Sequence, residues 1–157
     1  MSERKYLNVF LDSLKTYFDH LDSIFSEPGG ALEVGAPYLL KSNQRLGTGY
    51  IGLINVSGSS IGTIFVSAPG ALLKRILMTY GESGLGEEFK RDLIGEIANT
   101  LAGNARQYLG SEFHISTPCI LEGPLDLNNY KLSEHCYLLP FRWRSNKAEL
   151  LISIQTT

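Results

Sequence analysis

Residues 92–109, DLIGEIANTLAGNARQYL, constrain the fold of this chain more than any other stretch. At about 100° per residue, their side chains separate onto two faces of one helix. The apolar face is formed by Ile94, Ile97, Leu101, Ala105 and Tyr108. The polar face is formed by Asp92, Glu96, Asn99, Gly103, Arg106 and Gln107. We therefore expect the apolar face to lie on a core, and the polar face to present a carboxylate and an amide one turn apart to solvent.

A second long helix is predicted near the start of the chain. Its apolar positions recur at three- and four-residue steps: Tyr6, Leu7, Phe10, Leu11, Leu14, Phe18, Leu21 and Phe25. The pattern ends near the EPGG segment at residues 27–30. A short helix is predicted over residues 71–80, between Pro69 and Gly81.

Strands are predicted from short apolar and β-branched runs between turn residues. They cover residues 37–40, 50–56, 61–66, 114–121, 136–143 and 148–154. Turns are expected at residues 57–60 and 145–146. The late strands are candidates for pairing with a second copy of the chain.

The order long helix, short strand, hairpin occurs twice. The pseudo-repeats cover about residues 4–67 and 87–155, and a connecting helix at about residues 70–80 joins them. We predict one domain over residues 1–157, because a chain of this length can bury an adequate core. Its expected class is α/β, in α+β layers, with two long antiparallel helices packed on a mostly antiparallel β-sheet.

The two long helices differ at one position that matters for chemistry. Aligning Asn8 with Asn99 also aligns Tyr17 with Tyr108. Lys5 then stands where the second copy carries Glu96. The carboxylate–amide pair is therefore confined to the second helix.

Composition excludes several classes of protein. The formal net charge is -2 and there is no basic stripe, so no nucleic-acid partner is expected. No apolar run approaches the roughly 18 residues of a membrane span, and the first residues do not form a signal peptide, so we expect a cytoplasmic protein with no membrane association. Cys119 and Cys136 are too few for a disulfide framework and are expected to be reduced, packed as small apolar groups.

Two apparent binding motifs are rejected. Residues 47–52 spell G-x-G-x-x-G, but they open a strand, whereas a dinucleotide fingerprint follows a strand and opens a helix. The four nominal zinc ligands are His114, Cys119, His135 and Cys136. Neighbouring strand residues point to opposite faces, so His135 and Cys136 are not expected to share a metal. No metal site is predicted.

A carboxylate and an amide on a solvated helix face need no functional explanation by themselves. Small residues around Glu96 and Asn99 raise the expectation of function: Gly95, Ala98, Ala102 and Gly103. A glycine in a helix interior costs roughly 1 kcal/mol relative to alanine. Close approach of another backbone, from the paired helix or from a partner, would compensate that cost.

The combination of Asp92, Glu96 and Asn99 within GEIANTLAGNA, followed by ISTP at residues 115–118, resembles the signature of the CheC/CheX/FliY chemotaxis phosphatases. A single motif in the second long helix is similar to CheX rather than to CheC, which usually carries two. The similarity is strongest over residues 87–123, and the order of elements agrees over nearly the whole chain. The interval from Asn99 to Pro118 is a few residues shorter than is usual in the family.

This resemblance implies hydrolysis of the phospho-aspartate on a CheY-like receiver domain. Asn99 would orient the attacking water, and Glu96 would engage the receiver's active-site lysine. Asp92, Gly103 and Arg106 share the face and are candidates for partner contact, but for Asp92 the favoured alternative is a residue that only complements the helix dipole. The chain would need no cofactor of its own, because Mg²⁺ is supplied by the receiver, and a homodimer is implied. The alternative is a non-catalytic module that binds a receiver or assembles like the flagellar switch proteins.

Overall fold

The computed structural model describes residues 4–24, 31–40, 45–47 and 49–157. Its helices are α1 (Arg4–Ile24), α2 (Gly70–Thr79) and α3 (Glu87–Leu109). The ends of α2 and α3 follow the predicted signals. Pro69 precedes α2, while Gly81 (φ +76°) and Gly110 (φ +98°) follow the two helices in conformations that favour glycine. Phe25 and the predicted helix stop at residues 27–30 lie outside the described residues.

Within the described residues, eight strands form one antiparallel sheet in the order β1-β9-β10-β5-β4-β6, with β2 beside β9 and β7 beside β4. Its strands are β1 (Leu32–Val34), β2 (Tyr38–Leu39), β4 (Tyr50–Gly58), β5 (Ser60–Ala68), β6 (Phe113–Ile115), β7 (Cys119–Glu122), β9 (Cys136–Trp143) and β10 (Asn146–Thr156). The order is symmetric about the β10–β5 pair: the first strands of each half lie outside the hairpin of the other half. The predicted duplication itself remains a prediction.

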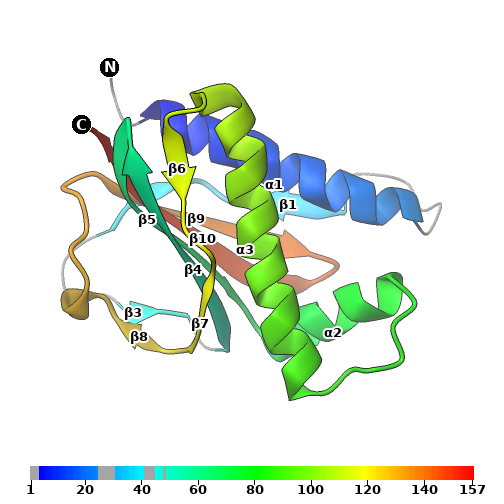
Figure 1. The fold of residues 1–157 in the computed structure, drawn as a ribbon. Helices are drawn as coiled ribbons and strands as arrows, with labels where there is room; N and C mark the ends of the chain where they lie inside the picture. Colours follow the sequence, from blue (N-terminus) through cyan, green and yellow to red (C-terminus); the bar gives the residue numbers. More distant parts are fainter. Residues whose placement is uncertain (1–3, 25–30, 41–44, 48) are drawn as a thin grey trace.

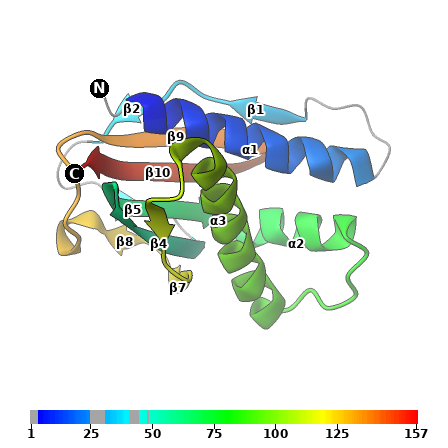
Figure 2. The ribbon, with the colours of Figure 1, turned by 45° about the horizontal axis from the view of Figure 1, so that its top comes forward.

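All three helices cover one face of this sheet (Figures 1 and 2). The long helices α1 and α3 run in opposite overall directions and cross one another (Figure 1). Alternation along β10 assigns its side chains to two cores: Leu150 and Ile152 face the helices, whereas Leu151 faces the other way. The predicted layers of helices on a mostly antiparallel sheet are confirmed.

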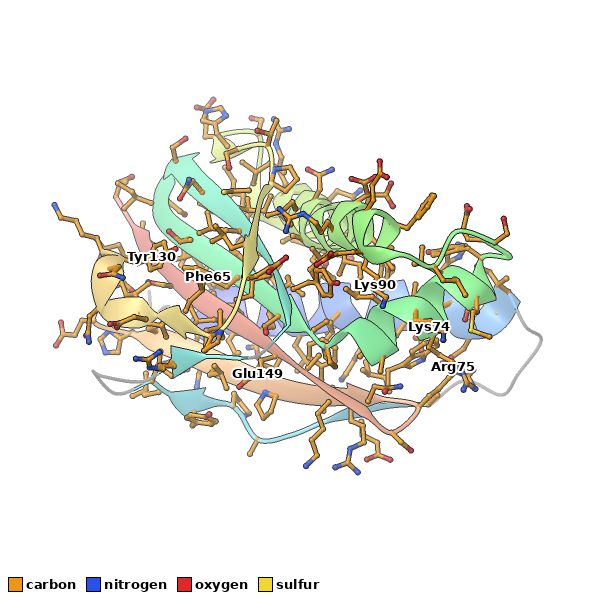
Figure 3. The ribbon with its side chains drawn as sticks, turned by 90° about the horizontal axis from the view of Figure 1, so that it is seen from below. Phe65, Lys74, Arg75, Lys90, Tyr130 and Glu149 are labelled. Atoms are coloured by element: carbon orange, nitrogen blue, oxygen red, sulfur yellow. The ribbon has the colours of Figure 1, made fainter. Side chains whose placement is uncertain are left out.

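The face of the sheet opposite the helices is covered by two short strands and a turn, none of which was predicted from the sequence. Strands β3 (Arg45–Leu46) and β8 (Leu125–Asp126) pair with each other, and the 3-10 turn η1 (Leu127–Asn129) follows. They close a second core around Phe65, whose ring meets that of Tyr130 edge-on at 5.3 Å between centroids. Figure 3 shows these two rings together, with Glu149 farther along the same side.

Three local predictions are corrected. The predicted strand over residues 114–121 is two strands, because residues 116–118 face only residues 54 and 55 of β4 and form a bulge. The first turn centres on Ser59, within the predicted residues 57–60, but the second lies at residues 144–145 rather than 145–146, and Arg144 and Ser145 there have φ values of +48° and +69°. The late strands β9 and β10 are interior to the sheet, so they are not its free edges.

Candidate functional site

Helix α3 is held tightly on the sheet and on α1. A Cβ atom at Gly52 of β4 would lie 2.8 Å from the carbonyl oxygen of Ile94, so strand and helix backbones are nearly in contact. The Ser13 hydroxyl of α1 donates to the carbonyl of Leu101 at 2.8 Å. The first turn carries Glu87 and Glu88, which suit the positive end of the helix dipole. The helix is therefore a firm support for the side chains on its outer face.

The outer face carries the predicted polar residues. Glu96 and Asn99 are exposed one turn apart. Asp92 and Arg106 are also exposed along the same face, and Gly103 is partly exposed. The predicted exposure of the carboxylate–amide pair is confirmed. Their chemical roles belong to the proposal below.

Tyr108 departs from the predicted apolar face. It is 76% exposed, although Ile97 and Leu101 on the same side are buried. Helical periodicity gives the direction of a side chain but does not show whether another element covers it. In the last turn of α3, nothing in the described part of the chain buries this ring.

The small residues of α3 mainly serve internal packing. Gly95, Ala98 and Ala102 are buried, and a Cβ atom at Gly95 would lie 2.7 Å from Cδ1 of Ile120 and 3.5 Å from Cγ of Pro118. The close contact at Gly95 is thus made by the side chains of Ile120 on β7 and of Pro118 before it, and not by the backbone of the paired helix or of a partner as expected. Gly103 differs from them, because a Cβ atom there would meet no neighbouring element within 4 Å among the described residues.

The two flanks of α3 place different neighbours beside the pair. Gly95 precedes Asn99 by one turn, so Asn99 lies on the flank next to Pro118. The other flank brings Glu96 near Tyr17 of α1, which also interacts with Tyr80, the residue that follows α2. Burial raises the pKa of the Tyr17 hydroxyl, and proximity to Tyr80, a hydrogen bond with it and the Glu96 carboxylate raise it further. Sequence reasoning missed both tyrosines, because helix periodicity does not predict which helices meet.

The start of α3 carries an acidic surface with a shallow depression of about 450 Å³. It is lined by Glu87, Glu88, Arg91, Asp92 and Glu122. Arg91 pairs with Glu122 at 3.0 Å, but both side chains are substantially exposed, so the pair adds little stability. Asp92 therefore lies at the acidic end of the face that carries Glu96.

A larger cleft of about 1070 Å³ lies on the far side of the sheet. Glu149 lines it, and burial raises the pKa of this carboxyl group, while a hydrogen bond from the backbone of Gly47 acts in the opposite direction. The cleft contains none of the predicted site residues. The segment 47–52 leads into β4 rather than a helix, which agrees with rejecting a dinucleotide fingerprint.

No group of three potential metal ligands among His, Cys, Asp and Glu occurs in the described ranges. Cys119 and Cys136 are free. Cys136 is buried, as expected, and burial raises its pKa to about 11, whereas Cys119 is exposed, contrary to the expectation of a packed thiol. In the portion of the chain that the structure covers, no helix is long and apolar enough to cross a membrane.

The fold is shared with CheC-like chemotaxis proteins. A CheC-like chemotactic protein from Shewanella oneidensis is 25% identical over 94% of this chain and 96% of its own, with a TM-score of 0.76. The chemotaxis protein CheX from Vibrio vulnificus is 26% identical over 96% and 99%, with a TM-score of 0.75. A CheX–CheY–BeF3–Mg²⁺ complex from Borrelia burgdorferi contains the same fold at 20% identity over 96% and 97%, with a TM-score of 0.70.

Within this structural class, the amino-acid sequence identifies the family to which the chain belongs. The family model described as chemotaxis phosphatase CheX matches residues 50–142, which is more than half of the chain. The chain therefore belongs to the CheX family of chemotaxis phosphatases. A comparison with curated proteins gave no significant match.

Proposed function

We propose that this protein accelerates hydrolysis of the phospho-aspartate on a CheY-like receiver domain. The observation that carries the proposal is the exposed Glu96–Asn99 pair on the firmly packed helix α3, in a chain of the CheX family. An acyl phosphate is already reactive, so its hydrolysis chiefly requires a water molecule positioned for in-line attack. A helix face that projects from the domain suits insertion into the active site of a partner.

Asn99 orients the attacking water in this proposal. An amide has both an acceptor oxygen and donor hydrogens, so it can hold a water molecule beside a phosphoryl group. A carboxylate at the same position would repel the anionic phosphoryl group. Asn99 lies one turn after Gly95, on the flank of α3 that faces Pro118.

Glu96 engages the active-site lysine of the receiver and sets the docking register. It lies on the tyrosine flank of α3, away from the Pro118 flank, so the two side chains can have separate tasks. Asp92, Gly103 and Arg106 lie along the same face and contact the receiver around the pair. Mg²⁺ belongs to the receiver in this proposal, and the chain contributes no cofactor.

The decisive experiment follows the decay of a phosphorylated receiver with and without the protein. Asn99→Ala should reduce the accelerated decay by at least about a hundredfold, because loss of water orientation removes the catalytic contribution. Asn8→Ala is the matched control, since Asn8 is an exposed asparagine on the other long helix. Full activity of Asn99→Ala would overturn the mechanism. Tight receiver binding without accelerated decay by the native chain would instead indicate a non-catalytic binding module.

Glu96→Ala separates docking from chemistry. It should raise KM for the phosphorylated receiver about tenfold, with a smaller effect on kcat, because a charge-assisted contact is lost. Steady-state decay measured over a range of receiver concentrations distinguishes the two constants. An unchanged rate at low receiver concentration would contradict the docking role.

The protein is further proposed to act as a homodimer. Residues Tyr38 and Leu39 of β2 are half-exposed at one end of the sheet order, outside β9. Such an edge can pair with a second copy of itself across a two-fold axis. Edge pairing would leave the outer face of α3 available to the receiver.

A further inference from the structure

Three large apolar side chains are exposed next to one flank of α3. Met78 near the end of α2, Tyr80 just after it and Phe89 in the first turns of α3 have exposed fractions of 50%, 41% and 44%. The loop of residues 81–86 connects these two helix ends. We refer to Met78, Tyr80 and Phe89 as the aromatic shoulder.

The members of the aromatic shoulder are linked by the loop between them. The Phe89 ring packs directly on Gly84, where any side chain would collide with it. Tyr80 is anchored by backbone hydrogen bonding to Ile76, and the amide of Gly81 donates to the carbonyl of Met78 at 3.0 Å. The shoulder is therefore fixed to a folded connection between α2 and α3.

The aromatic shoulder lies on the same side of α3 as Glu96. Phe89 precedes Glu96 by seven residues, so the two side chains lie on nearly the same line of α3, about 10 Å apart along the axis. At the opposite end of the shoulder, Tyr80 hydrogen-bonds to Tyr17, which lies within electrostatic reach of the Glu96 carboxylate. A partner that contacts Glu96 would thus meet this apolar surface on the α2 side.

The surroundings of the aromatic shoulder resemble the composition of a protein interface. Exposed aromatic and Met side chains are enriched in the centres of interfaces, and charged groups form the rim. Here the rim includes Lys74 and Arg75 of α2 and Glu88 of α3, all exposed. Figure 3 shows Lys74 and Arg75 on α2, next to the part of α3 that carries Lys90. Apolar side chains exposed on the side of α3 that carries Glu96 favour a surface that a partner covers.

We propose that the aromatic shoulder is the part of the docking surface that selects the receiver, by burying an apolar patch next to the receiver's active-site lysine. This inference rests on the proposed function, because its occupant is the receiver that Glu96 contacts. In the proposed complex, Glu96 and Asn99 contact groups of the receiver's phosphorylated active site. Met78, Tyr80 and Phe89 contact surface outside that site, where receivers can differ from one another.

The test compares single alanine variants of Met78, Tyr80 and Phe89 in the receiver-decay assay. Truncating Tyr80 or Phe89 should raise KM about tenfold with kcat nearly unchanged, because apolar burial far from the reacting atoms contributes binding alone. Tyr108→Ala is the matched control: it removes a 76%-exposed aromatic ring from the same helix outside the shoulder, and its KM should match that of the parent. Tyr80→Phe keeps the ring and separates its apolar contact from its hydroxyl.

A binding measurement separates this inference from the proposed function. Asn99→Ala, titrated with a receiver activated by beryllofluoride and Mg²⁺, reports docking without hydrolysis, and adding Phe89→Ala should weaken that docking about tenfold. Equal affinity and KM for the shoulder variants and Tyr108→Ala would reject the aromatic shoulder while leaving the phosphatase proposal intact. Absence of both binding and accelerated decay in the parent would reject the proposed function itself. Unchanged melting temperatures would confirm that the variants fold.

Discussion

At the scale of single residues, two glycines on α3 have opposite surroundings. Gly103 faces open space, whereas a Cβ at Gly95 would press on the end of Ile120. Gly103→Ala should stabilise the protein by about 0.5–1 kcal/mol through helix propensity, while Gly95→Ala should stabilise it less, because the end of the Ile120 side chain must move to admit the new methyl group. Urea unfolding of the two variants measures both changes. An equal or larger gain for Gly95→Ala would show that the contact with Ile120 carries no cost.

Glu149 gives stability a defined dependence on pH. Burial raises its pKa in the folded protein above the ordinary value of about 4.3, so the folded state binds its proton more tightly than the unfolded state does. The resulting stabilisation is present at low pH and is lost as the pH rises through the folded pKa. Relative to Glu149→Gln, the free energy of unfolding of the native protein should therefore fall with increasing pH above about 4.

Denaturant unfolding at several pH values checks this difference between the native protein and Glu149→Gln. Glutamine retains an oxygen that can accept from Gly47, so the comparison isolates the charge. Glu33→Gln on β1, which lies beyond β9 in the sheet, is the control, because Glu33 lines the same cleft and is exposed. A pH-independent difference for Glu149→Gln would contradict the effect of burial.

At the scale of elements, strong periodicity gave accurate predictions. The predicted range of β9 matches the structure, and α2 and α3 end at the expected glycines. The two-residue strands β3 and β8 were missed, because so short a segment carries no measurable alternation and depends on pairing with a distant partner. The bulge before β7 was missed for a similar reason, since register is a property of two strands together.

The same contrast applies to the candidate site. Sequence periodicity predicted the exposure of Glu96 and Asn99 because both lie opposite a continuous apolar stripe. It did not predict Tyr17 and Tyr80, which reach the site from other helices. Nor did it distinguish small residues that pack inward, such as Ala98, from Gly103, which faces open space. Which tyrosines reach the site and which small residues pack inward depend on contacts between elements, which the periodicity of one helix does not predict.

A buried ion pair joins the end of α1 to the turn between β9 and β10. Asp22 is 1% exposed, and its Oδ1 accepts from Trp143 Nε1 and from the Arg144 guanidinium, both at 3.1 Å. Asp22→Ala should cost about 3 kcal/mol of unfolding free energy, because it removes the buried carboxylate that compensates the arginine. Thermal and urea unfolding measure the loss. Asp19→Ala, at an exposed position of α1, should have little effect, and equal stability of both variants would contradict this assignment.

At the scale of the whole molecule, the sheet edge predicts the state of association. Sedimentation equilibrium should show a dimer, and Leu39→Lys should shift it toward monomer, because a lysine on an edge strand opposes pairing. Ile61→Lys is the matched control, since Ile61 is equally exposed at 50% on β5. A dimer that persists in Leu39→Lys would place the contact elsewhere. A monomer of the native chain would reject the homodimer.

The first strands of each half pair with the hairpin of the other half, and this pairing affects how the chain folds during synthesis on the ribosome. Strand β1 pairs with β9, so an early segment must wait for a partner near the end of the chain. Such distant pairing slows folding and exposes unpaired edges until the last strands emerge. Helix α3 is made before β9 and β10 as well. It packs directly on β4 and β5, which precede it, so the surface that carries Glu96 and Asn99 can be supported before β9 and β10 complete the sheet.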